Sequence, residues 1–586
     1  MYFLTSAGHD KAIARLSRDA TSACTAWRAN GRMIEEGDVR DWWRGAVIYQ
    51  IYPRSFADSN GDGVGDLPGI TRRLGHVASL GVDGIWLSPF FTSPMKDFGY
   101  DVADYCDVDP LFGTLADFDA LLAEAHRLGL KVIIDQVYSH SSDRHPWFEE
   151  SRQSRDNPKA DWYVWADPKP DGTPPNNWLA VFGGPAWTWD SRRRQYYLHN
   201  FLPEQPDLNF HNREVQEAAL QVAEFWLDRG VDGFRLDVAN LYCHDLRLTD
   251  NPPRPGPPQD RPYRMQRPLY NRGRPETLAF VARLRTLLDR YPDRMAVAEL
   301  ASSDDPIATM IEYTDGPDRY HTAYNFMLLS DPFGADVIRT ALSTTIGPPP
   351  RGWPSWAFSN HDVARAPSRW AAEAGAADAD PAFAKLLIAL LCSLRGTIFL
   401  YQGEELGLPQ ADVPFERLVD PEGIAFWPRH RGRDGARTPM PWLADAANAG
   451  FCRTGVEPWL PVDPRHAALA ADRQEADPDS VLAFTRAFLA WRKHHPALIR
   501  GDIRFIDVPE PLLAFERVAG AERVLCIFNL GGEPRAVPGG CGALTRLDAP
   551  GAGGMTDGSG VILPGRASLF ALIVRPEHER HADQTI

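Results

Sequence analysis

Acidic side chains stand at the ends of several short apolar runs in this sequence. Asp135, Asp237 and Glu299 each close such a run, and Asp362 follows a fourth run together with His361. Hydrolysis of a glycosidic bond needs such a set, because one carboxylate attacks the anomeric carbon and a second carboxyl group protonates the leaving oxygen. These segments contain no cysteine, phosphate-binding loop or zinc motif, so the pattern indicates glycoside chemistry.

The neighbours of two carboxyl groups suggest different roles for them. Arg235 precedes Asp237 by two residues, so in a strand both side chains share one face and the cation favours the ionised, attacking form of the carboxylate. The apolar run 295–298 precedes Glu299, and apolar surroundings raise the pKa of a carboxyl group, as a proton donor requires. A structural ion pair explains each residue taken alone. Polar or charged residues stand at four strand ends, and this agreement favours a catalytic role, because burying so many charges costs free energy.

Eight short runs rich in β-branched or aromatic residues predict the strands that position these side chains. They are Val47–Tyr52, Gly84–Ser88, Lys131–Val137, Gly233–Val238, Met295–Leu300, Thr322–Phe326, Trp356–His361 and Thr397–Gln402. Stretches with apolar residues three and four apart predict helices between them, including Leu115–Leu128, Arg213–Arg229, Pro275–Arg290 and Phe383–Leu394. This alternation predicts an α/β fold, a (β/α)8 TIM barrel, with its active site at the carboxyl ends of the strands.

The spacing of these elements predicts the domain organisation. The barrel is expected to occupy residues 41–138 and 211–495, and the long segment after the third strand predicts an inserted domain B at 139–210. Short strands with Gly and Pro turns, among them Val524–Asn529 and Ser568–Val574, predict a C-terminal antiparallel β-sandwich at 496–586. Residues 1–40 are expected to form a poorly ordered N-terminal extension. The proline-rich segment 251–268 predicts a long, stiff loop near the pocket mouth.

Composition excludes several classes of protein. Apolar residues make up 44% and charged residues 24%, as in globular proteins, so wholesale disorder is excluded. A net charge of −16 disfavours nucleic acid as a partner. The seven cysteines are scattered, and no apolar run has the length of a signal peptide or a membrane span. We therefore expect a cytoplasmic monomer or homodimer with no nucleic-acid or membrane partner.

A loop rich in oxygen donors follows the first predicted strand. Asp58, Asn60, Asp62, Val64 and Asp66 stand at every second position in a glycine-rich loop, so that oxygen donors recur in a pattern that suits a hard cation such as Ca²⁺. Gly69 occupies the place of the bidentate glutamate of an EF-hand, so the loop is not an EF-hand. A metal-free turn held by Asp and Asn side chains is the alternative.

Several ordered motifs resemble those of one enzyme family. The segments DQVYSH (135–140), GFRLD (233–237), AE (298–299) and SNHD (359–362) resemble the four signature regions of the α-amylase superfamily, glycoside hydrolase family 13. The segments DFGYDVADY (97–105), QPDLN (205–209) and RDGARTPMPW (433–442) resemble those of its α-glucosidase and oligo-1,6-glucosidase branch. The resemblance spans about residues 42–586, in the order barrel, domain B, barrel and sandwich.

Carried over position by position, the resemblance implies a catalytic set and a sugar-binding set. Asp237 would be the nucleophile, Glu299 the general acid and base, and Asp362 the carboxylate that holds the 2- and 3-hydroxyls of glucose. The implied substrate-binding residues are Asp97, Tyr100, His140, Phe182, Phe201, Arg235, His361 and Arg433. Asp97 would bind the 4-hydroxyl and pair with Arg433, which closes the pocket behind one glucose. The core of domain B is the alternative place for the two phenylalanines.

The resemblance also implies one structural calcium ion and no organic cofactor. Its implied ligands are Asp58, Asn60, Asp62, the carbonyl of Val64, and Asp66, and Mg²⁺ fits the same donors. Ser139 stands where many α-amylases have an asparagine that serves their second calcium site, so that site is expected to be absent.

The activity implied is that of a retaining, exo-acting α-glucosidase that releases glucose from the non-reducing end of a small oligosaccharide or short α-glucoside such as maltose. It would proceed through a covalent glucosyl-aspartate, which can pass to water or to another hydroxyl, so transglucosylation is open. Retention requires the carboxyl groups of Asp237 and Glu299 to lie about 5–5.5 Å apart.

Two features give conflicting indications of linkage preference. Val238 favours α-1,6 cleavage, whereas the segment 412–442 resembles enzymes that act on α-1,4 disaccharides. An oligo-1,6-glucosidase, or a sucrose or maltose isomerase or transglucosidase on the same scaffold, are the enzymatic alternatives. The non-catalytic heavy chains of amino-acid transporters also resemble this family, but they lack the catalytic set and carry a membrane helix.

Overall fold

The computed structural model describes residues 41–256, 261–301, 303–343, 351–538, 543–556 and 561–574. Contacts divide the chain into a short unit, Met1–Trp42, and a second unit, Trp43–Ile586. The predicted extension at residues 1–40 lies outside the described residues. The elements below all belong to the second unit.

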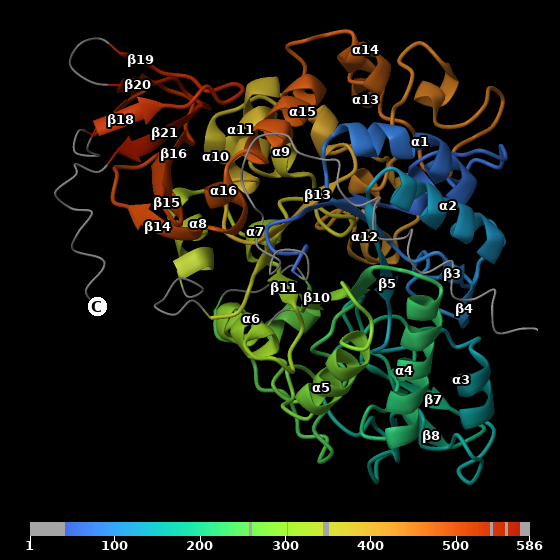
Figure 1. The fold of residues 1–586 in the computed structure, drawn as a ribbon. Coiled ribbons are helices and arrows are strands. Elements are labelled where there is room, and N and C mark those ends of the chain that lie inside the picture. The colour runs from blue at the N-terminus through green and yellow to red at the C-terminus, as the bar shows by residue number, and fades with distance from the viewer. Residues whose placement is uncertain are drawn as a thin grey trace, which may run out of the picture. The chain divides into compact units, whose positions relative to one another are not determined.

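Eight parallel strands form the central sheet of the fold (Figure 1). In chain order they are β1 (Val47–Ile51), β2 (Gly84–Leu87), β5 (Lys131–Gln136), β9 (Gly233–Leu236), β10 (Met295–Leu300), β11 (Thr322–Asn325), β12 (Ser355–Trp356) and β13 (Thr397–Tyr401). They are paired in the order β11-β10-β9-β5-β2-β1-β13-β12. A parallel bridge from Ala323 in β11 to Pro354, beside β12, joins the two ends of this order, so the sheet closes into a barrel. The predicted (β/α)8 fold is confirmed.

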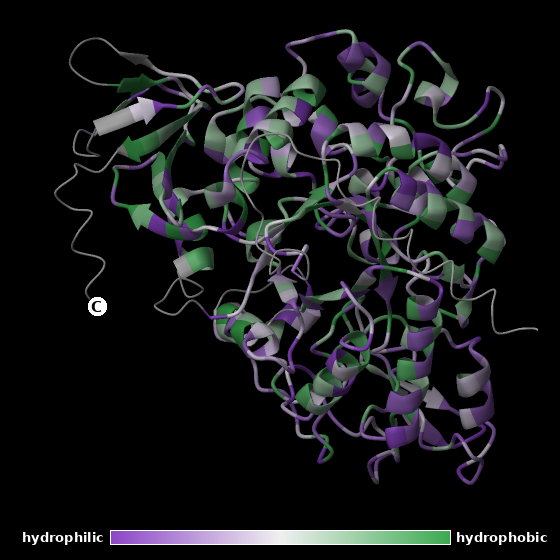
Figure 2. Cartoon of the chain, viewed as in Figure 1, coloured by the Kyte–Doolittle hydropathy of each residue, from purple (hydrophilic) through white to green (hydrophobic). Residues whose placement is uncertain are grey.

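Helices follow the barrel strands and carry one apolar face each. They include α1 (Leu67–Ser79), α2 (Leu115–Arg127), α4 (Arg213–Asp228), α5 (Thr277–Leu288), α6 (Pro306–Thr314), α7 (Met327–Ser330), α8 (Ala335–Ser343), α9 (Ala366–Arg369), α10 (Ala371–Ala374), α11 (Pro381–Leu391), α12 (Pro421–Phe426), α13 (Pro464–Ala468), α14 (Ala471–Glu475), α15 (Val481–Arg492) and α16 (Pro496–Arg500). In α4, Val215, Val222 and Trp226 are buried while polar residues lie between them, and Figure 2 shows both kinds of residue on this helix. Such a pattern is typical of a helix whose apolar face packs against a sheet.

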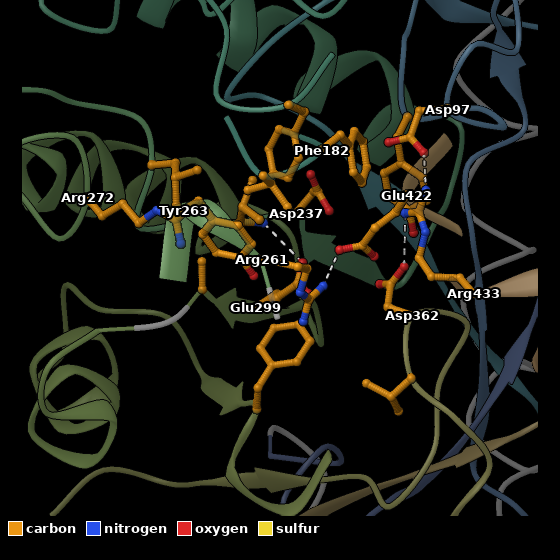
Figure 3. Close-up of a pocket in the computed structure, with 18 of the residues that line it drawn as sticks. Asp97, Phe182, Asp237, Arg261, Tyr263, Arg272, Glu299, Asp362, Glu422 and Arg433 are labelled. Atoms are coloured by element: carbon orange, nitrogen blue, oxygen red, sulfur yellow. Dashed lines mark hydrogen bonds and ion pairs between the residues drawn. The ribbon is translucent and has the colours of Figure 1, made fainter. Parts of the chain in front are cut away.

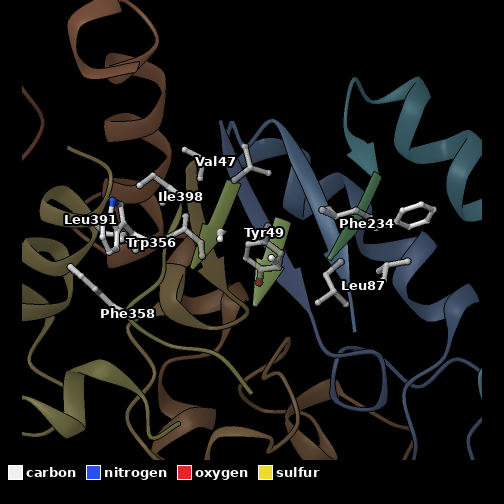
Figure 4. Close-up of a cluster of buried hydrophobic side chains, with 14 of the residues drawn as sticks. Val47, Tyr49, Leu87, Phe234, Trp356, Phe358, Leu391 and Ile398 are labelled. Atoms are coloured by element: carbon white, nitrogen blue, oxygen red, sulfur yellow. The ribbon is translucent and has the colours of Figure 1, made fainter. Parts of the chain in front are cut away.

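The strands of the barrel are buried on both faces. Figure 4 shows part of this core, in which Val47, Tyr49, Leu87, Phe234 and Ile398 come from four different strands. Strands that are covered on both sides have sequences dominated by apolar residues, and for this reason their positions could be predicted from the sequence.

The seventh strand is shorter than predicted. It spans Ser355–Trp356 rather than Trp356–His361. Beyond it, Asn360 Oδ1 accepts a hydrogen bond from the backbone N–H of Asp362 at 2.9 Å, and Ser359 Oγ accepts one from Ala366 at 3.0 Å. These side-chain acceptors replace the strand ladder and turn the chain at the site.

A small insertion separates β5 from α4. It contains α3 (Pro146–Ser151) and an antiparallel sheet of β6 (Trp165–Ala166), β7 (Trp187–Asp190) and β8 (Gln195–Leu198). A bridge between His140 and Asp207 brings its two ends together beside the barrel. A second excursion, formed by β3 (Phe91–Thr92) and β4 (Asp104–Val108), lies between β2 and α2.

The chain after α16 forms antiparallel sheets, which confirms the predicted C-terminal β domain. One sheet contains β14 (Asp502–Ile506), β15 (Leu512–Ala519), β16 (Glu522–Asn529), β18 (Ala543–Arg546) and β21 (Ser568–Val574). The other contains β17 (Arg535–Val537), β19 (Met555–Thr556) and β20 (Val561–Leu563). Within the described residues, no helix combines the length and the apolar character needed to cross a membrane.

Candidate active site

A pocket of about 190 Å³ lies where the carboxyl ends of the barrel strands meet domain B (Figure 3). Nine of the eleven residues predicted for catalysis and sugar binding line it, namely Asp97, Tyr100, His140, Phe182, Phe201, Asp237, Glu299, Asp362 and Arg433. The other two, Arg235 and His361, are fully buried and do not line it. The structure therefore brings the set together, with these two residues behind the pocket wall.

Arg235 is the hub of the pocket floor. Its Nη1 atom donates to Asp135 and to Asp237 at 2.7 Å each, and its Nη2 atom donates to Glu299. Both the Nε and Nη2 atoms also reach the hydroxyl of Tyr324, at 3.1 and 2.9 Å. One guanidinium thus fixes both predicted catalytic carboxyl groups, and its charge favours an ionised carboxylate beside it.

Glu299 lies in β10 and is almost completely buried. Burial raises the pKa of Glu299 well above its usual range, against the opposing effect of the Arg235 charge. Its Oε2 atom also accepts the backbone N–H of Val238 at 3.2 Å. Val238 has φ 34°, in the left-handed region that disfavours a β-branched residue. This strained backbone directs the N–H that follows Asp237 towards the acid.

Asp362 lies opposite, against a pair of arginines. Its Oδ1 atom accepts from Arg437 Nη2 at 2.9 Å and from Arg433 Nη1 at 3.4 Å. Burial opposes ionisation, but the positive charges around the carboxyl group prevail and hold the pKa of Asp362 below its usual range. The site therefore holds one carboxyl group that tends to stay protonated, Glu299, and one that stays ionised, Asp362.

The closed end of the pocket is an ion-pair cluster around Arg433. Arg433 Nη2 donates to Asp97 at 2.7 Å and to Asp420 at 2.8 Å, and Figure 3 shows Arg433 between Asp97 and Asp362. Its guanidinium also lies 4.9 Å from the ring centre of Phe182. Gln205 Nε2 donates to the second oxygen of Asp97 at 3.1 Å. The end of the pocket is thereby built from rigid, mutually satisfied groups.

Two histidines support this wall. The hydroxyl of Tyr100 lies 2.7 Å from His361 Nε2, and the two rings stack with centroids 5.3 Å apart. Burial lowers the pKa of His361 to about 3, so this ring is neutral at neutral pH. His140 Nε2 lies 3.0 Å from the Tyr100 carbonyl oxygen, and its ring contacts Phe201. Phe201 also contacts Phe182, so both phenylalanines face the pocket.

Several lining residues were not expected from the sequence. They are Val181, Val238, Leu241, Arg261, Tyr263, Arg264, Arg272, Ala301, Phe326, Ser330, Val363 and Glu422. Six of them belong to the loop between β9 and α5, whose proline-rich part is predicted from the sequence to lie near the mouth. Arg261 forms an ion pair with Glu422, which joins this loop to α12. Asp420 and Arg437 do not line the pocket but complete its ion pairs, and both lie next to or within the 412–442 motif.

The oxygen-rich loop after β1 has the donor chemistry for a hard cation. The Asp58 carboxylate accepts backbone N–H groups of Gly61 and Gly63, and Asp66 accepts those of Ser59 and Asn60. Each oxygen of Asp58 accepts one of these bonds and keeps a lone pair for a metal, whereas both bonds to Asp66 fall on its Oδ2 atom and occupy that oxygen. No group of three His, Cys, Asp or Glu side chains positioned to hold a metal occurs among the described residues. The calcium ion stays a prediction.

The barrel and its carboxyl groups define a (β/α)8 glycoside hydrolase, and comparison with known families agrees. The family described as "Alpha amylase, catalytic domain" matches residues 50–501. The chain belongs to this α-amylase family, glycoside hydrolase family 13.

Three relatives illustrate the similarity. The "Probable alpha-glucosidase" of Rhizobium meliloti (strain 1021) is 57% identical over 502 residues, covering 84% of this chain and 90% of the relative. The "Oligo-1,6-glucosidase" of Heyndrickxia coagulans is 38% identical over 530 residues, covering 84% and 92%. The crystal structure of the α-glucosyl transfer enzyme XgtA superposes with a TM-score of 0.87 at 56% identity, covering 91% of this chain and 99% of that chain.

Proposed function

We propose that the protein is a retaining, exo-acting α-glucosidase that releases glucose from the non-reducing end of short α-1,4-glucosides such as maltose. The observation that carries this proposal is the dead end of the pocket. Arg433, held by Asp97 and Asp420, blocks the space behind the carboxyl groups. A substrate that enters a pocket closed at one end presents only its terminal sugar to the reacting groups.

The arrangement of carboxyl groups supports a double-displacement mechanism. In the first step the Asp237 carboxylate attacks C1 of the glucose, and protonated Glu299 gives its proton to the departing oxygen. In the second step the Glu299 carboxylate takes a proton from water or an acceptor hydroxyl, whose oxygen displaces Asp237 from C1. Arg235 orients both groups, and ionised Asp362 holds the sugar hydroxyls. Glucose leaves with the α configuration with which it entered.

The same glucosyl-enzyme supports transfer as well as hydrolysis, because only the acceptor differs between the two. The similarity to a probable α-glucosidase and to an α-glucosyl transfer enzyme, at 57% and 56% identity, favours both outcomes for this chain. The lower identity of 38% to an oligo-1,6-glucosidase makes α-1,6 cleavage the second candidate, and Val238 is the feature that favours it. We also include one structural calcium ion in the proposal.

A time course on maltose, isomaltose and sucrose, with products separated by chromatography, tests the proposal. We expect glucose from maltose, with little from isomaltose. The reverse preference would identify an oligo-1,6-glucosidase, and conversion of sucrose to another disaccharide would identify an isomerase. Proton NMR of the first product distinguishes the stereochemistry, and initial release of β-glucose would refute the retaining mechanism.

A further inference from the structure

Arg272 is a buried cation that forms no ion pair with any residue that the structure describes. It lies in the loop between β9 and α5, and it is only 7% exposed. Among the described residues, no acceptor forms a hydrogen bond or ion pair with its guanidinium, and its buried Nε atom has no partner. Its guanidinium carbon lies 5.6 Å from the ring centre of Tyr263, and its charge is also attracted by the buried carboxyl group of Asp207, which forms no ion pair with it. A charge buried in this way is costly unless a partner compensates it.

Arg272 lines the active-site pocket at its open end. In Figure 3 it lies with Tyr263 on one side of Asp237 and Glu299, while Asp97 and Arg433 lie on the other. Asp97 and Arg433 close the end that takes the terminal glucose. The opposite end must therefore take the group that leaves the glucose or accepts it.

A second cavity continues from this end. It has a volume of about 540 Å³ and shares six lining residues with the pocket, namely Tyr263, Arg264, Arg272, Ala301, Phe326 and Ser330. Arg254 also lines it, and Asp331 is its one acidic lining residue among those described. The open end is thus lined by three arginines and one carboxylate, although the protein as a whole carries a net charge of −16.

Hydrogen bonds fix the backbone that carries Arg272. The neighbouring Asn271 is buried, and its Nδ2 atom donates to Asn200 Oδ1 in domain B at 2.9 Å. Asn251 Nδ2 donates to Asn271 Oδ1 at 2.9 Å. The loop is therefore tied to domain B beside Arg272, which fixes the position from which this side chain extends before a ligand arrives. Such preorganisation reduces the cost of binding.

We propose that Arg272 forms an anion-binding subsite for the leaving group or acceptor, which carries a carboxylate or a phosphate. The planar guanidinium offers paired N–H donors that match the oxygens of either group. The inference rests on the proposed glucosidase function, because the open end is an acceptor site only if glucose is cleaved or transferred at Glu299. Neutral aglycones remain substrates, but they leave the Arg272 charge uncompensated.

Hydrolysis of maltobionate and maltitol tests the subsite. The two substrates share the α-1,4 bond and differ at one carbon of the aglycone, which is a carboxylate in maltobionate and a hydroxymethyl group in maltitol. We expect kcat/KM for maltobionate to exceed that for maltitol by about ten- to a hundredfold, as hydrogen bonds to a charged group allow. Arg272→Gln should bring this ratio close to one, and Arg272→Lys should give an intermediate ratio.

Arg267→Gln is the matched control. Arg267 lies in the same loop and pairs with Asp304 at 2.5 Å, but it lines neither cavity and its side chain is 43% exposed. This variant should keep the wild-type ratio. Transfer from maltose to glycerol, glycerate and glycerol 3-phosphate separates the two anions, since preference for glycerate indicates a carboxylate site and preference for glycerol 3-phosphate a phosphate site.

A wild-type ratio of one or below would overturn the subsite, and so would an unchanged ratio in Arg272→Gln. If circular dichroism shows that Arg272→Gln does not fold, the wild-type ratio and Arg272→Lys decide the question. Hydrolysis of the neutral substrate p-nitrophenyl α-glucoside reports the proposed function separately. Activity on this substrate without an anion preference refutes only the subsite, whereas no activity on any α-glucoside refutes both.

Discussion

Replacing Glu299 by Gln tests its assignment as acid and base. The substitution keeps the size of the side chain and one acceptor oxygen, but it removes the transferable proton. Arg235 retains its ion pairs with Asp135 and Asp237, so the fold should survive with a loss of about 1–3 kcal/mol for the weakened hydrogen bonds. An essential acid/base supplies about 10²–10⁴-fold, which corresponds to about 2.7–5.5 kcal/mol of the barrier.

The assay compares two substrates and adds a small nucleophile. Maltose needs a proton on its leaving oxygen, so kcat/KM of Glu299→Gln on maltose should fall by at least about a hundredfold. Fluoride leaves without protonation, so kcat/KM on α-glucosyl fluoride should fall much less. Azide attacks without a base, and it should rescue turnover of α-glucosyl fluoride by forming α-glucosyl azide.

The variant Asp237→Asn provides the contrast. It lacks the attacking carboxylate, so it should be inactive on both substrates, and azide should not restore it through the same intermediate. Three results would refute our assignment of Glu299. They are more than about a hundredth of wild-type activity on maltose in Glu299→Gln, equal losses on both substrates, or the absence of azide rescue in a variant whose melting curve shows an intact fold.

Four further predictions follow from the geometry. Because burial raises the pKa of Glu299 and the acid must be protonated, kcat/KM on maltose should decline as pH rises through that pKa, and a pH profile on α-glucosyl fluoride should lack this alkaline limb. Arg433→Met leaves Asp97 and Asp420 as buried, unpaired carboxylates, so it should cost about 3–5 kcal/mol in a denaturant titration and also reduce kcat/KM on maltose. If the loop after β1 binds calcium, EDTA should lower the melting temperature. Removal of calcium that was present at a hundred times its dissociation constant should lower the free energy of unfolding by about 2.7 kcal/mol. The variant Asp62→Ala should melt at the same temperature with and without EDTA. Val238→Thr should raise the ratio of maltose to isomaltose hydrolysis by about tenfold if this residue sets linkage preference, and an unchanged ratio would exclude that role.

The barrel could be predicted from sequence because its strands are buried on both faces. The run 295–300 is apolar at every position but Glu299, and residues 132–134 form an apolar centre in another strand; such runs mark strands covered on both sides. The seventh strand was predicted too long because Ala357 and Phe358 continue the apolar pattern beyond the ladder, which ends at Trp356. Ser359 Oγ and Asn360 Oδ1 accept hydrogen bonds from backbone N–H groups and end the strand there, and strand propensity does not account for such side-chain acceptors.

The catalytic carboxyl groups could be predicted because local rules fix them. Two-residue spacing places Arg235 and Asp237 on one face of β9, and the structure joins them at 2.7 Å. No such local rule predicts the residues that line the open end of the pocket. Arg272 lies 35 positions after the nucleophile in a loop whose path depends on contacts with domain B, such as that of Asn271 with Asn200. Tertiary contacts of this kind leave no periodic signal in a single sequence.

Arg235, Arg433 and Arg272 differ in how their charge is compensated, and this difference indicates their roles. Arg235 pairs with three carboxyl groups on the floor, and Arg433 pairs with Asp97, Asp362 and Asp420 at the closed end. Both charges are satisfied by the protein, so these arginines hold catalytic and binding groups in place. Arg272 is buried to a similar degree but forms no ion pair with a described carboxylate, and the carboxyl group of Asp207 attracts its charge only from a longer range. A fold that compensates two of these buried charges so fully leaves the third for a ligand, and the ligand that compensates a guanidinium is an anion.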